Sequence, residues 1–471
     1  MNVAHKLFSR IFSTQFMVND KLKRGEITPN REAYRTVLWM ALPAVAEMVS
    51  VAVIGMADTA MVGVLGDYAV AAVGLTAQPR MIFLSLIFAL NVGVTAIVSR
   101  RKGEGDQDSA RLCLRQALVV ELALVLILTV ASLLLSKWLM GVAGAEADTI
   151  APATEYFRIL SCGLLFNAVS MTICGAQRGI GNTRITMTVN LTANLVNVVF
   201  NFLLIGGNFG FPRLGVAGAA IATVMGYAVG MALAIRSVVI KDSYLRISKK
   251  DDWKLNKPML KSITKIGGNS VLEQIVMRVG FFSYAAIVAR LGTASYAAHL
   301  IAMQLMNLSF TFADGIAAAS TSLVGQNLGK KRPDLSIMYG KIGQRFALVI
   351  SIVLCIVSIT GRAVFPTLFT KELATIAAAA EVIFILGLIQ PIQTTQIVMA
   401  GSLRGAGDTR FVAITMLFTA ALLRPSVSLL FIYVLGWGLP GAWYAVIVDQ
   451  CIRLFLLYRR FSQGKWISIK V

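Results

Sequence analysis

The ten residues GAQRGIGNTR at positions 175–184 return as GSLRGAGDTR at positions 401–410, which is 226 residues further along the chain. Other identical residues fall at the same offset: Glu47 and Glu273, Leu65-Gly66 and Leu291-Gly292, Gln78 and Gln304, Thr95 and Thr321, Gly103 and Gly329, and Glu155 and Glu381. A single offset that holds through six successive apolar stretches indicates an internal duplication. The sequence therefore predicts two similar halves.

The composition is that of a membrane protein. Hydrophobic residues make up 57% of the chain and charged residues 14%, whereas soluble proteins have about 45–50% and about 25%. Twelve apolar stretches are long enough to cross a hydrocarbon core of about 30 Å; they lie near 36–64, 69–99, 112–137, 152–177, 185–207, 214–237, 263–291, 295–328, 338–361, 375–403, 411–435 and 440–458. We predict an all-α polytopic membrane protein with twelve transmembrane helices.

The polar segment KDSYLRISKKDDWKLNK at residues 241–257 separates two sets of six apolar stretches. Because six is even, the two halves share one orientation and form parallel repeats, an arrangement suited to alternating access. The expected domains are an N-terminal tail (1–34), an N-lobe (35–240), a linker (241–258), a C-lobe (259–460) and a C-terminal tail (461–471). The spacing of Leu7, Phe8, Ile11, Phe12 and Phe16 fits an interfacial amphipathic helix, although a flexible basic tail fits equally well.

The basic residues gather in alternate loops. The chain has 44 Lys and Arg against 23 Asp and Glu, a net charge of +21, and clusters such as Arg100-Arg101-Lys102 and Lys330-Lys331-Arg332 lie on one predicted side. The positive-inside rule places both termini and the linker in the cytoplasm of a plasma (inner) membrane protein. The charge therefore indicates contact with anionic membrane lipids and argues against nucleic acid as a partner.

Residues for enzyme or metal chemistry are scarce. The five cysteines form no CxxC pair, and the two histidines, His5 and His299, have no cysteine or histidine cluster around them. The chain also lacks a Walker A motif and a nucleophile–base pattern. We expect no enzymatic activity, no metal site and no cofactor.

Asp58 is the sharpest functional candidate. It lies in the first apolar stretch among Met56, Ala57, Ala60 and Met61, with no basic residue within one helical turn. An ionisable side chain in mid-membrane is costly and is a functional candidate by default. We expect Asp58 to exchange protons, although a hydrogen-bonded structural carboxylate near the end of the span is the alternative.

Asparagines form a stripe on the fifth apolar stretch. Asn190, Asn194, Asn197 and Asn201 are 4, 3 and 4 residues apart, which places them on one face of a helix. Such amides either hold neighbouring helices together or act as neutral ligands around a cation or a carboxylate.

Several motifs together resemble the MATE (multidrug and toxic compound extrusion) family. They are the Arg-Gly-x-Gly-[Asn/Asp]-Thr-Arg turns in both halves, Asp58-Thr59 with Val62-Gly63 and Leu65-Gly66, Ala297-Ala298-His299, and the run GVAGAAIAT at 215–223. The resemblance covers about residues 35–460. It implies a V-shaped transporter with an N-lobe and a C-lobe that exports amphipathic, often cationic compounds in exchange for H⁺ or Na⁺. We expect it to be a monomer.

By this resemblance Asp58, Asn197, Asn201 and Thr223 match the family's N-lobe cation site. Asn201 stands where many relatives have a second carboxylate. Because hard cations favour charged oxygen ligands, a single acid favours H⁺ as the coupling ion, with Na⁺ as the alternative.

Four more residues complete the predicted site. Glu273 is either the acid of the C-lobe or, like its counterpart Glu47, a structural residue. Gln78 and Gln304 are expected to line the cleft, and Pro43 to permit bending of the first helix.

The same wider fold grouping includes flippases of polysaccharides and lipid-linked precursors, which is the alternative function. A pyrophosphate substrate would call for several cations in the cleft, whereas the main intramembrane cations here are Arg80, Arg278 and Arg424.

Overall fold

The computed structural model describes residues 12–248 and 250–469. All regular secondary structure within these residues is helical. Twelve helices are long and apolar enough to cross a membrane, which confirms the predicted fold class. They are α2 (Asn30–Gly63), α3 (Asp67–Glu104), α4 (Gln107–Val142), α5 (Ile150–Gly179), α6 (Thr183–Gly206), α7 (Gly215–Val239), α8 (Lys257–Ala289), α9 (Thr293–Gly329), α10 (Pro333–Gly361), α11 (Leu373–Gly405), a segmented helix (Thr409–Val434) and α14 (Gly438–Ser462).

Short 3₁₀ turns lie between and beside these helices. They are η1 (Thr14–Phe16), η2 (Asp20–Leu22), η3 (Asn208–Gly210), η4 (Phe365–Leu368) and η7 (Lys465–Ser468). The predicted amphipathic helix of the N-terminal tail falls mostly outside the described residues, since these begin at Phe12.

The chain forms two compact units. Unit 1 consists of Met1–Val45 and Asn269–Val471, and unit 2 of Ala46–Gly268. Helices α2 and α8 therefore each begin in one unit and end in the other. As a result, Pro43 and Asp58 lie on the same helix but in different units.

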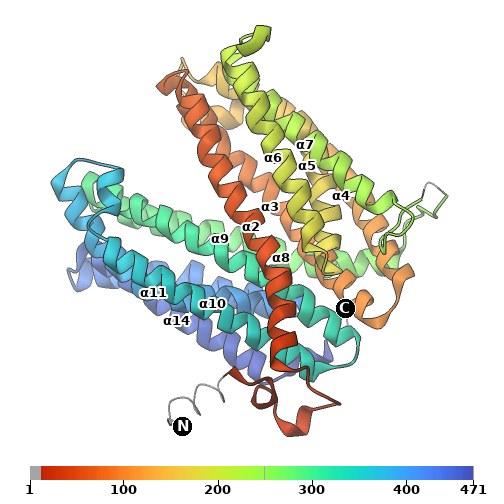
Figure 1. The fold of residues 1–471 in the computed structure, drawn as a ribbon. Coiled ribbons are helices and arrows are strands. Elements are labelled where there is room, and N and C mark those ends of the chain that lie inside the picture. The colour runs from red at the N-terminus through yellow and green to blue at the C-terminus, as the bar shows by residue number, and fades with distance from the viewer. Residues whose placement is uncertain (1–11, 249, 470–471) are drawn as a thin grey trace. The chain divides into compact units, whose positions relative to one another are not determined.

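Unit 2 is a bundle in which α3 to α7 run alongside one another (Figure 1). Glycines allow α6 and α7 to approach closely: a Cβ on Gly226 would lie 2.6 Å from the carbonyl oxygen of Ala193, and a Cβ on Gly218 would lie 2.6 Å from that of Leu204. Small residues at helix crossings are typical of membrane proteins, where close packing drives association. This crossing brings Thr223 of α7 next to Asn197 of α6.

The duplication in the sequence is also visible in the contacts. The Thr95 hydroxyl donates to the carbonyl oxygen of Gly175 at 2.9 Å, and Thr321, at the same offset, donates to that of Gly401 at 2.8 Å. The turns after α5 and α11 need a glycine with positive φ, which is 90° at Gly181 and 87° at Gly407. The repeated Arg-Gly-x-Gly motif therefore encodes the same helix–turn–helix geometry twice.

In unit 1, α11 packs against α9, α10 and α14. The segmented helix consists of α12 (Thr409–Met416), the π-helical stretch η5 (Leu417–Leu423), α13 (Arg424–Leu429) and the π-helical stretch η6 (Leu430–Val434). Pro425 at the start of α13 lacks the backbone N–H that would continue a regular ladder. The two π-helical stretches flank the buried side chain of Arg424.

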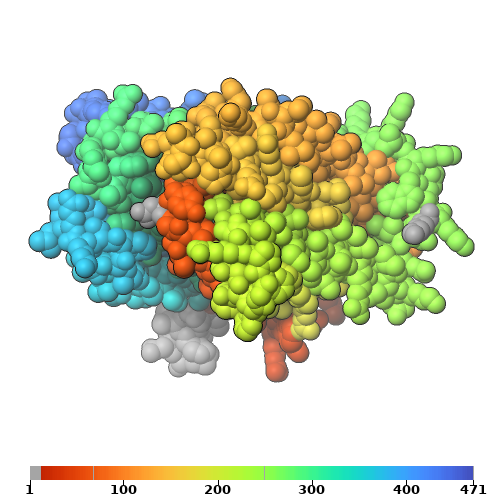
Figure 2. Space-filling view, turned by 90° about the horizontal axis from the view of Figure 1, so that it is seen from above, coloured from red at the N-terminus to blue at the C-terminus, as the bar shows by residue number. Residues whose placement is uncertain are grey.

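The linker between α7 and α8 is tied to unit 2 by side chains of α4: Gln107 and Arg111 donate to the carbonyl oxygen of Tyr244 at 2.9 and 3.2 Å, and Gln116 contacts the linker backbone twice. The Gln116 amide donates to the carbonyl oxygen of Lys254 at 2.8 Å and accepts from the backbone N–H of Asn256 at 2.9 Å. The remaining linker side chains are mostly exposed, and Figure 2 shows them projecting from one end of the unit. The linker is therefore fixed at its backbone, while most of its charged side chains face outward.

Gly226→Ala is expected to destabilise the protein, because the new Cβ would lie 2.6 Å from the carbonyl oxygen of Ala193 in a tight helix crossing. Overpacking of this kind typically costs about 1–3 kcal/mol. The measurement is the thermal unfolding midpoint of the purified protein in detergent. Gly141→Ala is the control, because a Cβ there meets no atom within 4 Å; equal midpoints for the two variants would contradict the packing argument.

Candidate functional site

A cavity of about 420 Å³ lies inside unit 2, between α2, α3, α5, α6 and α7. Its walls are largely valine, isoleucine and alanine side chains. Its polar lining consists of Asp58, Thr59, Thr76, Arg80, Tyr156, Asn194, Asn197, Asn201, Thr223 and Tyr227. Small-molecule sites have this character, since they combine mostly apolar walls with a few placed polar groups.

Asp58 is held by amides of α6. Asn201 donates through Nδ2 to Asp58 Oδ1 at 2.6 Å. The amide of Asn197 satisfies both of its neighbours when Nδ2 donates to the Asp58 oxygens at 2.7 and 3.0 Å and Oδ1 accepts from the Thr223 hydroxyl at 3.1 Å. Asp58, Asn197, Asn201 and Thr223, predicted as one site, thus lie together.

The asparagine stripe divides between two carboxylates. Asn194 lines the cavity with Asn197 and Asn201. Asn190 instead donates at 2.7 Å to Glu47, which is 3% exposed and lies outside the cavity lining. Three amides of the stripe thus face the cavity, and the fourth ties α6 to α2.

Glu47 accepts hydrogen bonds from three side chains of unit 2. Besides Asn190, it accepts from the Thr186 hydroxyl at 2.8 Å and from the guanidinium of Arg178 at 3.1 Å. A buried carboxylate with three donors is well satisfied. Glu47 therefore has the contacts of a structural residue.

Glu273 has an equivalent arginine partner in unit 1. It is 1% exposed and pairs with Arg404, whose Nε lies 3.3 Å from Glu273 Oε2. The partner comes from the Arg-Gly turn, as it does for Glu47 and Arg178. The ion pair favours the structural reading of Glu273 over an acid that exchanges protons.

The remaining predicted residues lie elsewhere. Gln78 on α3 and Gln304 on α9 have exposed side chains, and the cavity lining includes neither of them. Pro43 is buried within α2, which continues through it as a helix. The described residues contain no group of three or more His, Cys, Asp or Glu side chains placed to hold a metal ion.

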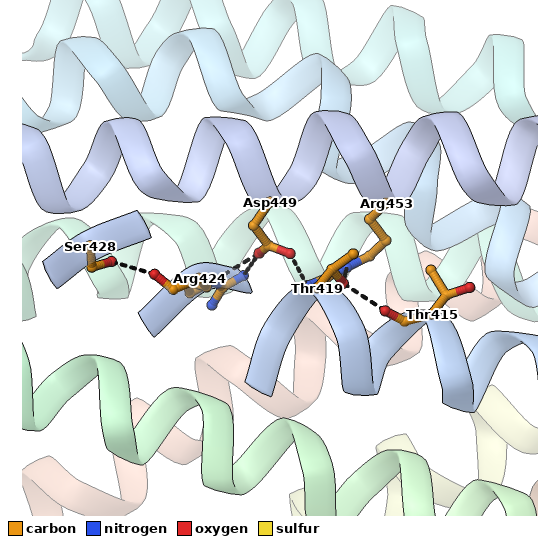
Figure 3. A network of polar contacts seen from close by, with 6 residues as sticks. All are labelled: Thr415, Thr419, Arg424, Ser428, Asp449 and Arg453. Carbon is orange, nitrogen blue, oxygen red and sulfur yellow. Dashed lines mark hydrogen bonds and ion pairs between the residues drawn. The ribbon is translucent and has the colours of Figure 1, made fainter. Parts of the chain in front are cut away.

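Unit 1 contains a buried charge network around Asp449 (Figure 3). Arg424 donates through Nε to Asp449 Oδ2 at 2.8 Å, and Arg453 donates through Nη2 to Asp449 Oδ1 at 2.6 Å. Arg453 also donates to the Thr419 hydroxyl at 2.8 Å. Asp449 and Arg453 are four residues apart on α14, and Arg424 reaches the same carboxylate from α13.

Sequence reasoning missed part of the cavity lining. Arg80, Tyr156 and Tyr227 face the same cavity as Asp58. Arg80 was visible as an intramembrane cation, but its spacing from Asp58 along the chain gives no sign that the two meet. Glu121 on α4 is also buried with both carboxylate oxygens unpartnered, yet it does not line the cavity, so this cavity gives a ligand no access to it.

Two repeats of six membrane helices with a polar cavity around one acid define a secondary transporter. The sequence model of the MatE family matches residues 43–203 and 270–430, once in each half. The chain therefore belongs to the MATE family, as its motifs indicated. Members of this family are transporters and not enzymes.

The chain is similar to full-length relatives. It is 28% identical to the probable multidrug resistance protein NorM of Thermotoga maritima, over 92% of this chain and 93% of the relative. It is 27% identical to the multidrug resistance protein PmpM of Pseudomonas aeruginosa, again over 92% and 93%. An outward-facing multidrug resistance MATE family transporter has the same fold, with a TM-score of 0.86 at 22% identity over 94% of this chain and 98% of that one.

Asp449→Asn is expected to destabilise the protein strongly, because it leaves Arg424 and Arg453 buried without their shared counter-charge. Removing one partner of a buried ion pair typically costs about 3–5 kcal/mol. Thermal and denaturant unfolding of the purified protein measures the loss. Asp20→Asn, whose side chain is 91% exposed, is the control, and a shift no larger than that of the control would refute a structural role for the network.

Proposed function

We propose that this transporter is a cation-coupled antiporter that exports amphipathic, often cationic drugs or metabolites, with H⁺ as the coupling ion. The observation that carries the proposal is Asp58. Among the described residues that line the cavity it is the sole acid, and its contacts are neutral amides rather than a salt bridge. A carboxylate without a bound counter-charge can take up either a proton or a cationic substrate.

The donor geometry supports H⁺ over Na⁺. Asn201 turns an N–H toward Asp58, and Asn197 does the same in the orientation that satisfies both of its neighbours. A Na⁺ site would instead gather oxygen atoms, several of them charged, around the ion. The site has a single carboxylate, and each amide beside it can turn either its N–H to the charged acid or its oxygen to the protonated acid, which suits H⁺.

The names of the relatives support export as the direction of transport. The proteins from T. maritima and P. aeruginosa are described as multidrug resistance proteins, the first as a probable one. The charge pattern of the loops supports a plasma (inner) membrane orientation with both termini and the linker in the cytoplasm. We further propose that the protein acts as a monomer in contact with anionic lipids, with lobes at 35–240 and 259–460.

The predicted residues have different roles in this proposal. Asp58, Asn197, Asn201, Thr223 and Asn194 form the coupling and substrate site, because they share one cavity. Pro43 permits α2 to bend, and Gln78 and Gln304 contact the substrate outside the cavity. Asn190 and Glu273 are assigned to the two buried ion-paired clusters.

A flippase of lipid-linked precursors is the alternative, and the cavity gives it little support. A pyrophosphate carries several negative charges and would need several cations around it. The cavity is lined by one arginine, Arg80, and also by an acid. Drug export is therefore the better fit.

The first experiment uses purified protein in liposomes with ethidium as substrate and either a pH gradient or a Na⁺ gradient. Export should follow the pH gradient and be lost in Asp58→Asn, because that change removes the proton-binding group. Asp108→Asn is the matched control, since its side chain in unit 2 is 98% exposed. Export driven only by Na⁺, or export that survives Asp58→Asn, would overturn the proposal.

Asn201→Asp is a second test. The amide nitrogen of Asn201 lies 2.6 Å from Asp58 Oδ1, so the substitution places a second carboxylate beside the first. Two charged oxygen ligands should create a Na⁺ site. We expect a Na⁺ gradient to drive ethidium export in this variant and not in the wild type. Thr188→Asp, on the exposed face of the same helix and outside the cavity lining, is the comparison; absence of Na⁺-driven export in Asn201→Asp would argue against the assigned position of the cation.

A further inference from the structure

The cavity of unit 2 contains a cation as well as an acid. Arg80 follows Pro79 on α3 and lines the cavity together with Asp58 and the phenol rings of Tyr156 and Tyr227. It lies close enough to Asp58 and to Tyr156 to interact electrostatically with both. The described residues nevertheless include no salt bridge or hydrogen bond to Arg80, and its Nε is buried without a partner.

This environment is unusual for an arginine on a membrane-spanning helix, because such residues are normally paired. Two other arginines of unit 2 follow that rule. Arg158 donates through Nε to the Ser136 hydroxyl at 2.7 Å, and Arg178 pairs with Glu47 at 3.1 Å. Arg80 thus keeps N–H donors available in a space that a small molecule can enter.

A substrate with only a positive charge can pair with Asp58 but leaves Arg80 without a counter-charge. A substrate that also carries a carboxylate can pair with both Asp58 and Arg80, since guanidinium and carboxylate form a strong charge-assisted pair. The apolar walls and the two tyrosines can hold an aromatic body between these groups. The cavity volume, about 420 Å³, is within the usual range of about 300–1,000 Å³ for ligand pockets.

We infer that the cavity is a two-pole site for amphoteric substrates, in which Asp58 receives the cationic group and Arg80 receives a carboxylate. This inference rests on the proposed export function and names its substrate class. Binding of a proton to Asp58 displaces the cationic group, whereas the charge of Arg80 stays the same. Arg80 is therefore a specificity residue that affects substrate affinity rather than proton coupling.

The test compares two dyes with the same aromatic body. Rhodamine 123 is a methyl ester with a single positive charge, and its free acid carries a carboxylate in addition. The wild type should bind the free acid more tightly than the ester in fluorescence anisotropy of the purified protein. A wild type that binds the ester equally well or better would overturn the inference without any variant.

Arg80→Gln should raise the ratio of the free-acid Kd to the ester Kd by about tenfold or more, which is the usual effect of losing a charged hydrogen bond. Arg80→Lys keeps the charge but loses the planar fork, so the ratio should move less. Arg158→Gln, which removes an arginine of unit 2 outside the cavity lining, should leave the ratio unchanged. If Arg80→Gln lowered the affinity for both dyes equally, Arg80 would act only as a counter-charge for Asp58, and the inference would be refuted.

The two proposals can fail separately. If wild-type protein exports neither ethidium nor rhodamine 123 under any gradient, the export function fails, and the anisotropy ratio still decides the two-pole site. If ethidium is exported with the pH gradient but the dye ratio is the same in wild type and Arg80→Gln, the export function stands and the two-pole site is wrong.

Discussion

Each half of this transporter depends on one buried ion pair, Glu47 with Arg178 in unit 2 and Glu273 with Arg404 in unit 1. Lipid cannot solvate a carboxylate, so each glutamate is tolerated only while its arginine is in place. The arginine sits where the fourth helix of the half ends, and the glutamate sits on the first. The pair therefore fixes the end of one helix against another, and the glycine turn that follows sets the direction of the next.

The two halves share this ion pair and glycine turn but differ in the residues around them. At the offset of 226 residues, Thr186 and Asn190, which complete the shell of Glu47, correspond to the apolar Val412 and Met416. Asp58 likewise corresponds to Tyr284, whose ring lies 5.7 Å from the Arg424 guanidinium. The two halves share the same ion pair and glycine turn, but one unit adds a cavity with an acid and the other a buried ion-paired cluster around Asp449.

The sequence predicts those features that depend on a single helix. Length and apolar composition identified the twelve spans, and the i,i+4 spacing of Asp449 and Arg453 is enough to relate those two side chains. Helical spacing placed the four asparagines on one face, but it cannot say which neighbour each residue on that face meets. Asn190 and Asn201 therefore serve different carboxylates for a reason that only the packing of α6 against α2 supplies.

Contacts between segments that are distant in sequence could not be predicted either, because they too depend on which helices pack together. Arg404 reaches Glu273 from 131 residues away, and Arg80 and Asp58 lie on different helices with nothing in their spacing to relate them. A charge pattern along the chain can show that an arginine is inside the membrane. Whether that arginine is paired depends on the tertiary fold, and this distinction separates the structural Arg178 from the unpaired Arg80.

The difference between the two acids, Asp58 and Asp449, follows from their partners. Asp449 is fully buried between two arginines, so protonating it would leave two buried cations without compensation. Asp58 contacts amides, and an amide side chain can turn either its N–H or its oxygen toward a carboxyl group. Such neutral partners can accommodate both the charged and the protonated form of the acid. A group that must change its charge in each transport cycle needs this tolerance, which is why the cavity of unit 2 rather than the core of unit 1 is the better place for coupling.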